Sequence, residues 1–248
     1  MVTTTRVGDA LPVPVAEFVE TAIGLSHRHD PVAPRTGGPA GNARLTAWLG
    51  ILLLIAFLVE LVTLLSLQQM IAVHLFVGAF LVPLALLKTV TTTWRMARYY
   101  LGNRAYRIAG PPPLLLRALG PLVVLTALGV LGTGLALVAL GRDGTRQSFG
   151  SFGGFQLDAL TLHKGAFVLW LAVTAVHTIG RLIPAAQLAT NRVAGRVPVP
   201  GAAVRASLLV GCLAVATVVG FVVTSAGSDW NHGFGRDDYR GFAHNQDH

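Results

Sequence analysis

Residues 162–177 read LHKGAFVLWLAVTAVH and place two histidines, His163 and His177, fourteen residues apart in a largely apolar segment. A second apolar segment, HLFVGAFLVPLALLK at residues 74–88, carries His74 and Lys88 at the same offset. On an α-helix, fourteen residues rise about 21 Å and turn to within about 40° of whole turns, so each pair lies on one helix face. One member of each pair then lies near each surface of a membrane. Because ionisable side chains inside a bilayer are costly and usually functional, these four residues are the first candidates for a site.

The composition places the chain in a membrane. Of the 248 residues, 53% are hydrophobic and only 12% are charged, and the mean hydropathy is +0.62. That is too little polar surface to cover a soluble globule of this size. The sequence therefore predicts an all-α integral membrane helical bundle. Its five transmembrane helices are expected where apolar stretches of about 20 residues occur, at roughly 46–66, 71–93, 114–140, 161–180 and 204–225.

The distribution of arginine predicts the orientation, because positively charged loops stay cytoplasmic. Two loops carry arginines and no acid: Arg95, Arg98, Arg104, Arg107 and Arg117 in one, and Arg181, Arg192, Arg196 and Arg205 in the other. The 141–160 loop and the carboxyl tail mix both signs. We therefore expect a multi-pass protein of the cytoplasmic membrane, with its N-terminus cytoplasmic and its C-terminus outside. The net charge of +8 is then a topology signal, and no nucleic-acid partner is expected.

Three regions follow from these patterns. Residues 1–45 form a cytoplasmic N-terminal segment in which Val15, Phe18, Val19, Ala22 and Ile23 make one apolar stripe behind Pro14. That stripe indicates either a short amphipathic helix, lying on the leaflet or docking a partner, or a loosely ordered tail. Residues 46–226 form the bundle, and residues 227–248 form a polar external tail. The 141–160 loop is glycine-rich and is expected to be a flexible outer cap, where, together with the tail, an outer partner would dock.

The histidines point to haem. Histidine is the commonest axial ligand of haem iron, and bundle cores usually hold such cofactors. If the second and fourth helices are neighbours, His74 and His163 lie at the same outer depth and can clamp one iron. Gly78 and Gly165 would leave room for the porphyrin edge. Cationic partners for the propionates are expected at the outer surface, from Lys164, Arg142 and Arg146.

The inner site has three interpretations. His177 and Lys88 either ligate a second haem together, or His177 is the lone ligand of a five-coordinate haem while Lys88 pairs with a propionate. In the third interpretation the inner site is empty and Lys88 snorkels. Lysine ligates iron only as the neutral amine, which requires burial to favour its deprotonation. We expect one haem b at the outer site and keep a second as an open alternative.

Glu60 is a further ionisable group within the predicted spans. It is expected within about two turns of the level of His74. There it would either accept a proton from a quinol or orient an imidazole. The simpler alternative is a buried, protonated carboxyl bonded to a neighbouring helix. For the three histidines, the corresponding alternative is that each only hydrogen-bonds another helix.

The motifs around His163, His177 and His74 resemble those of membrane b-type cytochromes with a four-helix haem bundle. These are the cytochrome b561-like proteins, the ferric-reductase-like group and the cytochrome b subunits that anchor dehydrogenases. The resemblance covers residues from about 46 to 181. It implies bis-histidine haem and electron transfer between a quinone pool or donor and a redox partner on the other face. Lys88 departs from the family pattern, in which a histidine is expected at this place, and puts the second haem in doubt.

Two classes of function follow. The first is a membrane-embedded electron-transfer subunit, non-catalytic by itself, that belongs to an oxidoreductase complex and meets a partner redox protein on the outer face. No flavin or nicotinamide motif is present, so a self-contained reductase is not expected. The second class is a haem-free transporter or assembly scaffold that uses Glu60, His74 and Lys88 as a proton or ion path. The single cysteine, Cys212, excludes an internal disulfide and a cysteine-ligated iron–sulfur cluster.

Overall fold

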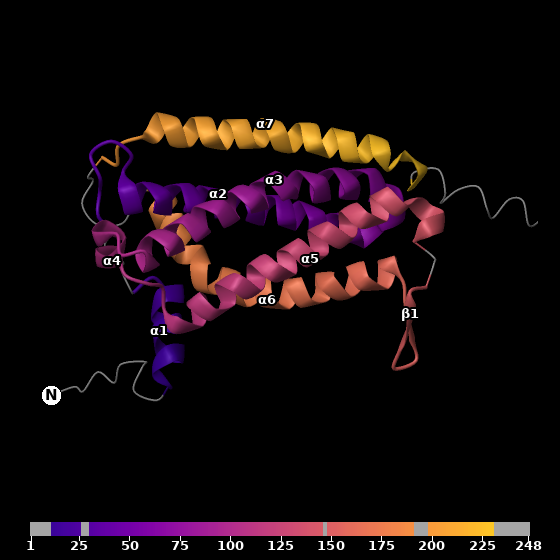
Figure 1. Cartoon of the computed structure of the whole chain (residues 1–248), viewed down its shortest axis with the longest axis horizontal. Coiled ribbons are helices and arrows are strands. Elements are labelled where there is room, and N and C mark those ends of the chain that lie inside the picture. The colour runs from indigo at the N-terminus through magenta and orange to yellow at the C-terminus, as the bar shows by residue number, and fades with distance from the viewer. Residues whose placement is uncertain (1–10, 26–29, 146–147, 191–197, 231–248) are drawn as a thin grey trace, which may run out of the picture.

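A computed structural model describes residues 11–25, 30–145, 148–190 and 198–230 of the chain. The expectations for Arg146 and for the tail beyond residue 230 lie outside these residues. Figure 1 shows the elongated bundle. Its elements are α1 (Val13–Ala22), α2 (Gly38–Thr63), η1 (Leu64–Ser66), α3 (Leu67–Tyr100), α4 (Arg104–Ala109), α5 (Leu114–Gly144), β1 (Gly150–Phe152), β2 (Phe155–Leu157), α6 (Ala159–Ala189), α7 (Ala202–Ala226) and η2 (Ser228–Trp230).

The chain is an all-α helical bundle with four segments long and apolar enough to cross a membrane within the described residues. They are Gly38–Tyr100, Leu114–Gly144, Ala159–Ala189 and Ala202–Ala226. The sequence separates the first of these into two spans because residues 67–70 include polar side chains. In the structure that link contains a 3-10 turn at Leu64–Ser66 and a kink at Met70, so α2 and α3 follow each other without an irregular loop.

The long first segment folds back on itself. Near its two ends, Asn42 Nδ2 donates to the carbonyl of Thr91 at 3.1 Å. Near the turn, Thr63 Oγ1 lies 3.1 Å from His74 Nδ1. Residues early in α2 thus meet residues late in α3, and late residues of α2 meet early residues of α3. The two helices are therefore antiparallel neighbours, as the short link between them predicts.

Helix α2 begins well before the predicted apolar stretch. Gly37 has a φ of 77°, a left-handed conformation that suits glycine, and α2 starts at Gly38 with Pro39 in its first turn. Hydropathy places the start near residue 46 because Asn42 and Arg44 are polar. The helix continues through both polar residues, since hydropathy detects only the part of a helix that suits a hydrocarbon environment.

Helix α7 packs on the outside of the α2–α3 pair. Leu49 of α2 and Leu84 of α3 are fully buried against Leu209, Cys212 and Leu213 of α7. Further along α7, a Cβ at Gly220 would lie 2.7 Å from the Phe76 ring, so only glycine lets the two helices approach so closely. This packing forms the apolar core of the bundle and leaves α2, α3, α5 and α6 to enclose a cavity on the other side.

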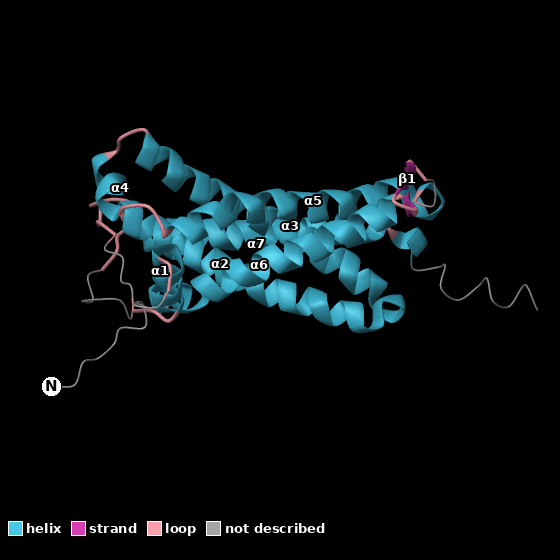
Figure 2. Cartoon of the chain, turned by 90° about the horizontal axis from the view of Figure 1, so that it is seen from below, coloured by secondary structure: helices cyan, strands magenta, loops and turns pink. Residues whose placement is uncertain are grey.

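The two ends of the bundle are structurally different (Figure 2). One end carries α1 and α4 and is called the α4 end. Here Phe18 of α1 packs against Gly180 of α6. A Cβ at Gly180 would lie 2.5 Å from the Phe18 ring and 2.8 Å from Leu116 of α5. Helix α1 is thus docked against α5 and α6. The opposite end carries β1 and β2 and is called the hairpin end.

The glycine-rich loop expected to be a flexible cap contains a short β-hairpin. Strand β1 pairs antiparallel with β2, with Gly150 opposite Leu157 and Phe152 opposite Phe155. The turn consists of Gly153 and Gly154, whose φ angles are 58° and 85°. Two residues with positive φ favour the right-handed twist of a two-residue hairpin, which explains why paired glycines fold here instead of leaving the loop irregular.

The exterior of the bundle is apolar along its length. One valine or leucine in each long segment illustrates this: Val90, Leu128, Val168 and Val210 are 62%, 51%, 65% and 65% exposed. A soluble protein rarely exposes so continuous an apolar surface, whereas a lipid-facing surface requires one. The composition, helix lengths and exterior together indicate a multi-pass membrane protein.

Candidate functional site

A cavity of about 1620 Å³ lies between α2, α3, α5 and α6. It exceeds the range of about 300–1,000 Å³ that is usual for small-molecule sites. His74 and His163 line the cavity towards the hairpin end, and Lys88 and His177 line it towards the α4 end. The four residues separated by fourteen-residue offsets therefore share one cavity. Glu60, Gly78 and Lys164 also line it, whereas Arg142 and Gly165 are not among its lining residues.

Two side chains of α2 hold His74 through its Nδ1 atom. This nitrogen lies 2.8 Å from Glu60 Oε1 and 3.1 Å from Thr63 Oγ1. The Thr63 hydroxyl donates a hydrogen bond to the backbone carbonyl of Glu60 at 2.6 Å, so toward His74 its oxygen can only accept a hydrogen bond. The carboxylate oxygen likewise accepts. Nδ1 of His74 therefore carries the ring proton and donates to both groups.

His163 repeats this arrangement across a different pair of helices. Its Nδ1 lies 3.1 Å from Thr133 Oγ1 of α5, and that hydroxyl donates to the backbone carbonyl of Gly129 at 2.7 Å. The hydroxyl oxygen again accepts, so Nδ1 of His163 carries the proton. A Cβ at Gly134 would lie 3.2 Å from His163 Cε1, so the small residue leaves room for the imidazole beside α5.

Both imidazoles are thus fixed in the same tautomer. With the proton on Nδ1, the lone pair of a neutral ring is on Nε2. Within the described residues neither Nε2 has a hydrogen-bond partner. The two rings are also close enough to interact electrostatically. A hydrogen bond at Nδ1 that fixes the tautomer and leaves Nε2 available is the usual support of a metal-ligating histidine.

The opposite end of the cavity is organised differently. Lys88 Nζ donates to the backbone carbonyl of Thr46 at 3.0 Å, and a Cβ at Gly50 would lie 2.9 Å from this ammonium. His177 Nδ1 is buried and has no hydrogen-bond partner among the described residues, and the same holds for Thr174 Oγ1 one turn earlier on α6. In that part of the chain no side chain fixes the His177 tautomer as Thr63 and Thr133 fix the imidazoles at the hairpin end.

Aromatic side chains line the cavity between its two ends. Trp170 lies seven residues from each histidine of α6. Its ring packs edge-on against Phe57 of α2, with 4.5 Å between the ring centroids, and lies 6.3 Å from Phe167. All three residues line the cavity. An aromatic, apolar lining of this kind is common in sites for large apolar ligands.

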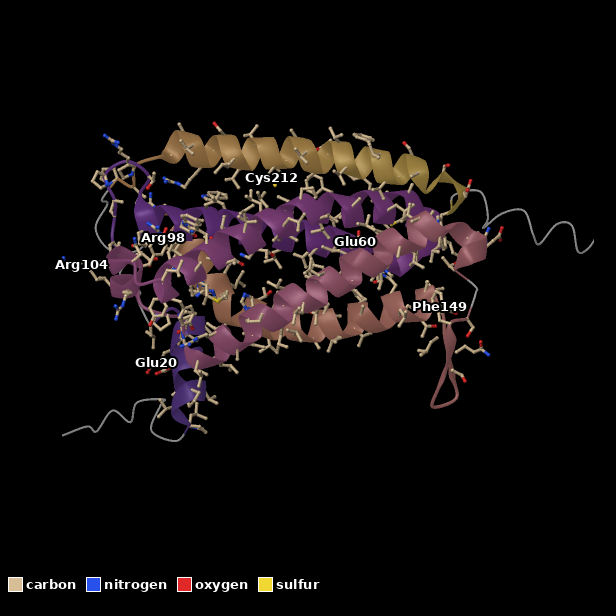
Figure 3. The ribbon with its side chains drawn as sticks, viewed as in Figure 1. Glu20, Glu60, Arg98, Arg104, Phe149 and Cys212 are labelled. Atoms are coloured by element: carbon tan, nitrogen blue, oxygen red, sulfur yellow. The ribbon has the colours of Figure 1, made fainter. Side chains whose placement is uncertain are left out.

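The remaining predicted residues occupy several places. Glu60 is buried inside the bundle (Figure 3), with Oε1 on His74 and Oε2 lacking a partner. A Cβ at Gly78 would lie 3.4 Å from Glu60 Oε1, whereas a Cβ at Gly165 would meet nothing within 4 Å. Lys164 is exposed at the cavity rim. The half-buried Arg142 follows a break in α5 at Gly141, beyond the cavity lining.

The donor set at the hairpin end suits a haem better than an ion held by protein side chains alone. Among the described residues, no group of three or more histidine, cysteine, aspartate or glutamate side chains could hold a metal ion. An ion bound by protein ligands alone is thus not favoured, but a haem iron needs only axial ligands. Two neutral imidazoles with available Nε2 atoms, a large apolar cavity and aromatic walls fit a haem b at the hairpin end.

Sequence reasoning missed several groups that line or support the cavity: Thr63, Thr133, Thr174 and Arg181. Threonine is common in apolar helices, where its hydroxyl bonds to its own backbone, so its presence alone is no signal. Thr174 did carry a weak signal. It lies three residues before His177, which places both on one helix face.

Compared with models of known protein families, with curated proteins and with solved structures, the chain shows no significant match. The structure is a bundle of apolar helices with candidate membrane spans. The resemblance to b-type cytochromes, drawn from the histidine spacing, stays a prediction.

Proposed function

We propose that this protein is a membrane-embedded b-type cytochrome subunit, which carries electrons between a quinone pool or donor and a partner redox protein. The observation that carries the proposal is the matched pair of supports: Thr63 and Thr133 each hold a histidine Nδ1 at 3.1 Å. Each support leaves Nε2 of His74 or His163 as the free ring nitrogen. A pair of histidines that only joined helices would have no need for identical tautomers facing one cavity.

A haem bound between His74 and His163 would supply one-electron transfer within the membrane. The chain's own residues would grip it, orient it and exclude water. Thr63, Thr133 and Glu60 would keep the imidazoles in position, and Lys164 and Arg142 would offer positive charge to the propionates near the hairpin end. Because the protein has no second redox group of its own in this proposal, it acts as a non-catalytic subunit.

We also infer five membrane crossings, with α2 and α3 as separate spans. Their antiparallel contacts support this inference, since a hairpin of two long helices returns to the side on which it began. The described arginines Arg98 and Arg104 lie at the α4 end (Figure 3), which would then be cytoplasmic. The hairpin end would face outward and would be the docking side for the redox partner.

A haem-free function has one observation in its favour. Glu60 Oε2 is buried without a partner in the part of the chain that the structure describes, and Glu60, His74 and Lys88 line the same cavity. Unsatisfied polar atoms of this kind are typical of a proton or ion path. This second candidate is a haem-free transporter or scaffold protein.

The deciding experiment is a reduced-minus-oxidised spectrum of the purified protein, with a pyridine haemochrome count per chain. The protein should be expressed with haem supplied, and its folding checked by size-exclusion chromatography. One haem per chain is expected, held between His74 and His163. Two haems would require His177 as a further ligand at the α4 end. No Soret band in folded protein would reject the cytochrome and favour the haem-free function.

A further inference from the structure

The α4 end of the cavity has hydrogen-bonding groups that no part of the described protein satisfies. Thr174, His177 and Arg181 occur at spacings of three and four residues and so share one face of α6. All three line the cavity. Thr174 Oγ1 and His177 Nδ1 are buried without partners. In native structures, buried polar atoms without partners are rare and indicate a missing water, ion or ligand.

The same region concentrates positive charge. Lys88 faces this part of the cavity from α3, and Lys88, His177 and Arg181 are close enough to interact electrostatically. Within the described residues neither Lys88 nor Arg181 has an ion-pair partner, and Arg181 has no hydrogen-bond acceptor. Asp30, the nearby acid, is paired with Arg95 and also attracts the Arg181 guanidinium, while Glu17 and Glu20 are exposed where they line the cavity. One partly buried carboxylate therefore faces several cations, and the excess of buried positive charge favours a further anion among them.

The chemistry of the donors defines the anion. Lys88 uses one N–H on the Thr46 carbonyl and keeps others free. The Arg181 guanidinium offers a planar fork, and the Thr174 hydroxyl and the His177 ring add further donors. Phosphate and carboxylate oxygens accept several such bonds at once, and arginine binds them in pairs. The site is therefore suited to a phosphate-like group and not to a cation.

The surroundings indicate that the anion belongs to a molecule with an apolar chain. Around the cavity, α3 and α5 pack against each other less extensively than any other neighbouring pair of helices. Their lining residues near this end, such as Met96 and Leu114, are apolar and more than half exposed, at 52% and 59%. At the rim, the Arg117 guanidinium lies 5.6 Å from the Tyr100 ring centroid. The cavity is therefore least covered between α3 and α5, where exposed apolar side chains line it.

We propose that the α4 end of the cavity binds the phosphate headgroup of an anionic membrane lipid through Lys88, Thr174, His177 and Arg181. The acyl chains would lie along the apolar walls near α3 and α5. This site uses none of the groups that hold His74 and His163, so the lipid proposal can be tested independently of the haem proposed there.

The test is lipid binding by the purified full-length protein in detergent. Dioleoyl phosphatidylglycerol, dioleoyl phosphatidylcholine and inorganic phosphate are added separately, and binding is followed by native mass spectrometry and by the thermal unfolding midpoint. Phosphatidylglycerol should bind and stabilise the protein, and zwitterionic phosphatidylcholine should bind much more weakly. Equal binding of the two lipids would overturn the proposal. Full stabilisation by inorganic phosphate alone would also overturn it, because the site would then take a free ion.

Substitutions localise the binding. Arg181→Gln and Lys88→Gln should each weaken phosphatidylglycerol binding by about tenfold or more, since each removes a charged hydrogen bond. Arg104→Gln is the matched control, because Arg104 is exposed on α4 at the same end of the bundle. Wild-type affinity in both Arg181→Gln and Lys88→Gln would refute the site.

Thr174→Val keeps the test decisive if the charge variants do not fold. This change removes a buried hydroxyl without a partner, so it should leave the lipid-free protein as stable as before or more stable. It should nevertheless weaken phosphatidylglycerol binding. Thr217→Val is the control, since Thr217 is exposed on α7 and donates to its own helix.

A haem count on the same samples separates the two proposals. A second haem that disappears in His177→Ala would overturn the lipid site, and lipid binding in protein without haem would support it.

Discussion

Thr63 Oγ1 lies 3.1 Å from His74 Nδ1, across the turn that joins α2 to α3. Thr133 and His163 make the same contact between α5 and α6, also at 3.1 Å. In both cases the threonine hydroxyl donates a hydrogen bond to a backbone carbonyl of its own helix. The two supports differ in their second partner, because His74 Nδ1 also donates to the Glu60 carboxylate, whereas the further acceptor for the His163 ring is the neutral backbone carbonyl of Val130.

That difference predicts unequal effects of removing the two hydroxyls. Thr133→Val should weaken haem retention by about 10–100-fold, the usual cost of losing a group that orients a metal ligand. Thr63→Val should weaken it less, since Glu60 still holds the His74 ring. The rate of haem transfer to apomyoglobin measures retention. Thr133→Ser keeps the hydroxyl and should restore slow transfer, whereas equal transfer rates in all variants would contradict the assigned supports.

The sequence predicted which ionisable side chains line the interior of the bundle, but not what holds them. The fourteen-residue offsets identified His74, His163, His177 and Lys88, and these residues do line one cavity. Their depth follows from helix geometry, which is local. The hydrogen bonds that support the imidazoles do not follow from local geometry, because Thr63 and Thr133 act across helix pairs. The sequence does not specify which helix faces pack together. Glu60 was expected near His74, and the direct contact at 2.8 Å depends on that same packing.

The fold was predictable where hydropathy is the governing property. The apolar segments and the all-α bundle follow from it. The boundaries were less accurate, since α2 begins at Gly38, ahead of Asn42 and Arg44. The short link after α2 was expected to form a tight hairpin, and its 3-10 turn at Leu64–Ser66 does return the chain antiparallel to α2. Backbone hydrogen bonding determines these features, and side-chain hydropathy does not report on it.

Alanine substitutions should separate the histidines by function. His74→Ala and His163→Ala should each abolish the same haem, because either change removes an axial ligand. His177→Ala should leave that haem in place, since His177 lies at the other end of the cavity. The pyridine haemochrome count of each purified variant is the measurement. Full haem content in all three variants would show that none of these histidines is an essential ligand.

Docking of α1 depends on a glycine. A Cβ at Gly180 would lie 2.5 Å from the Phe18 ring and 2.8 Å from Leu116, so Gly180→Ala should destabilise the protein by about 1–3 kcal/mol through overpacking. It should also make α1 more sensitive to limited proteolysis. Gly211→Ala is the control, because a Cβ there meets nothing within 4 Å. Equal midpoints and cleavage rates for the two variants would show that α1 does not dock through Phe18.

The start of α6 should respond to pH through Asp158. Its Oδ1 accepts the backbone N–H of Thr161 at 2.6 Å, and this hydrogen bond holds the pKa of the exposed carboxyl below its usual value of 3.8. Because the pKa is lower in the folded state, the stabilisation is complete above the unfolded value and is lost as the pH falls through the folded one. Protection of the first turn of α6 from hydrogen exchange, corrected for the intrinsic rate, should therefore decrease only in acid.

Two variants check this pH dependence. Asp158→Asn still accepts the Thr161 N–H but does not titrate, so its protection should be nearly independent of pH. Asp158→Ala removes the acceptor and should leave the first turn poorly protected at every pH. If wild-type and Asp158→Asn proteins lost protection in parallel as the pH falls, a group other than Asp158 would control the start of α6. His163 lies five residues further along this helix, so fraying that extends to it would also loosen the ring held by Thr133.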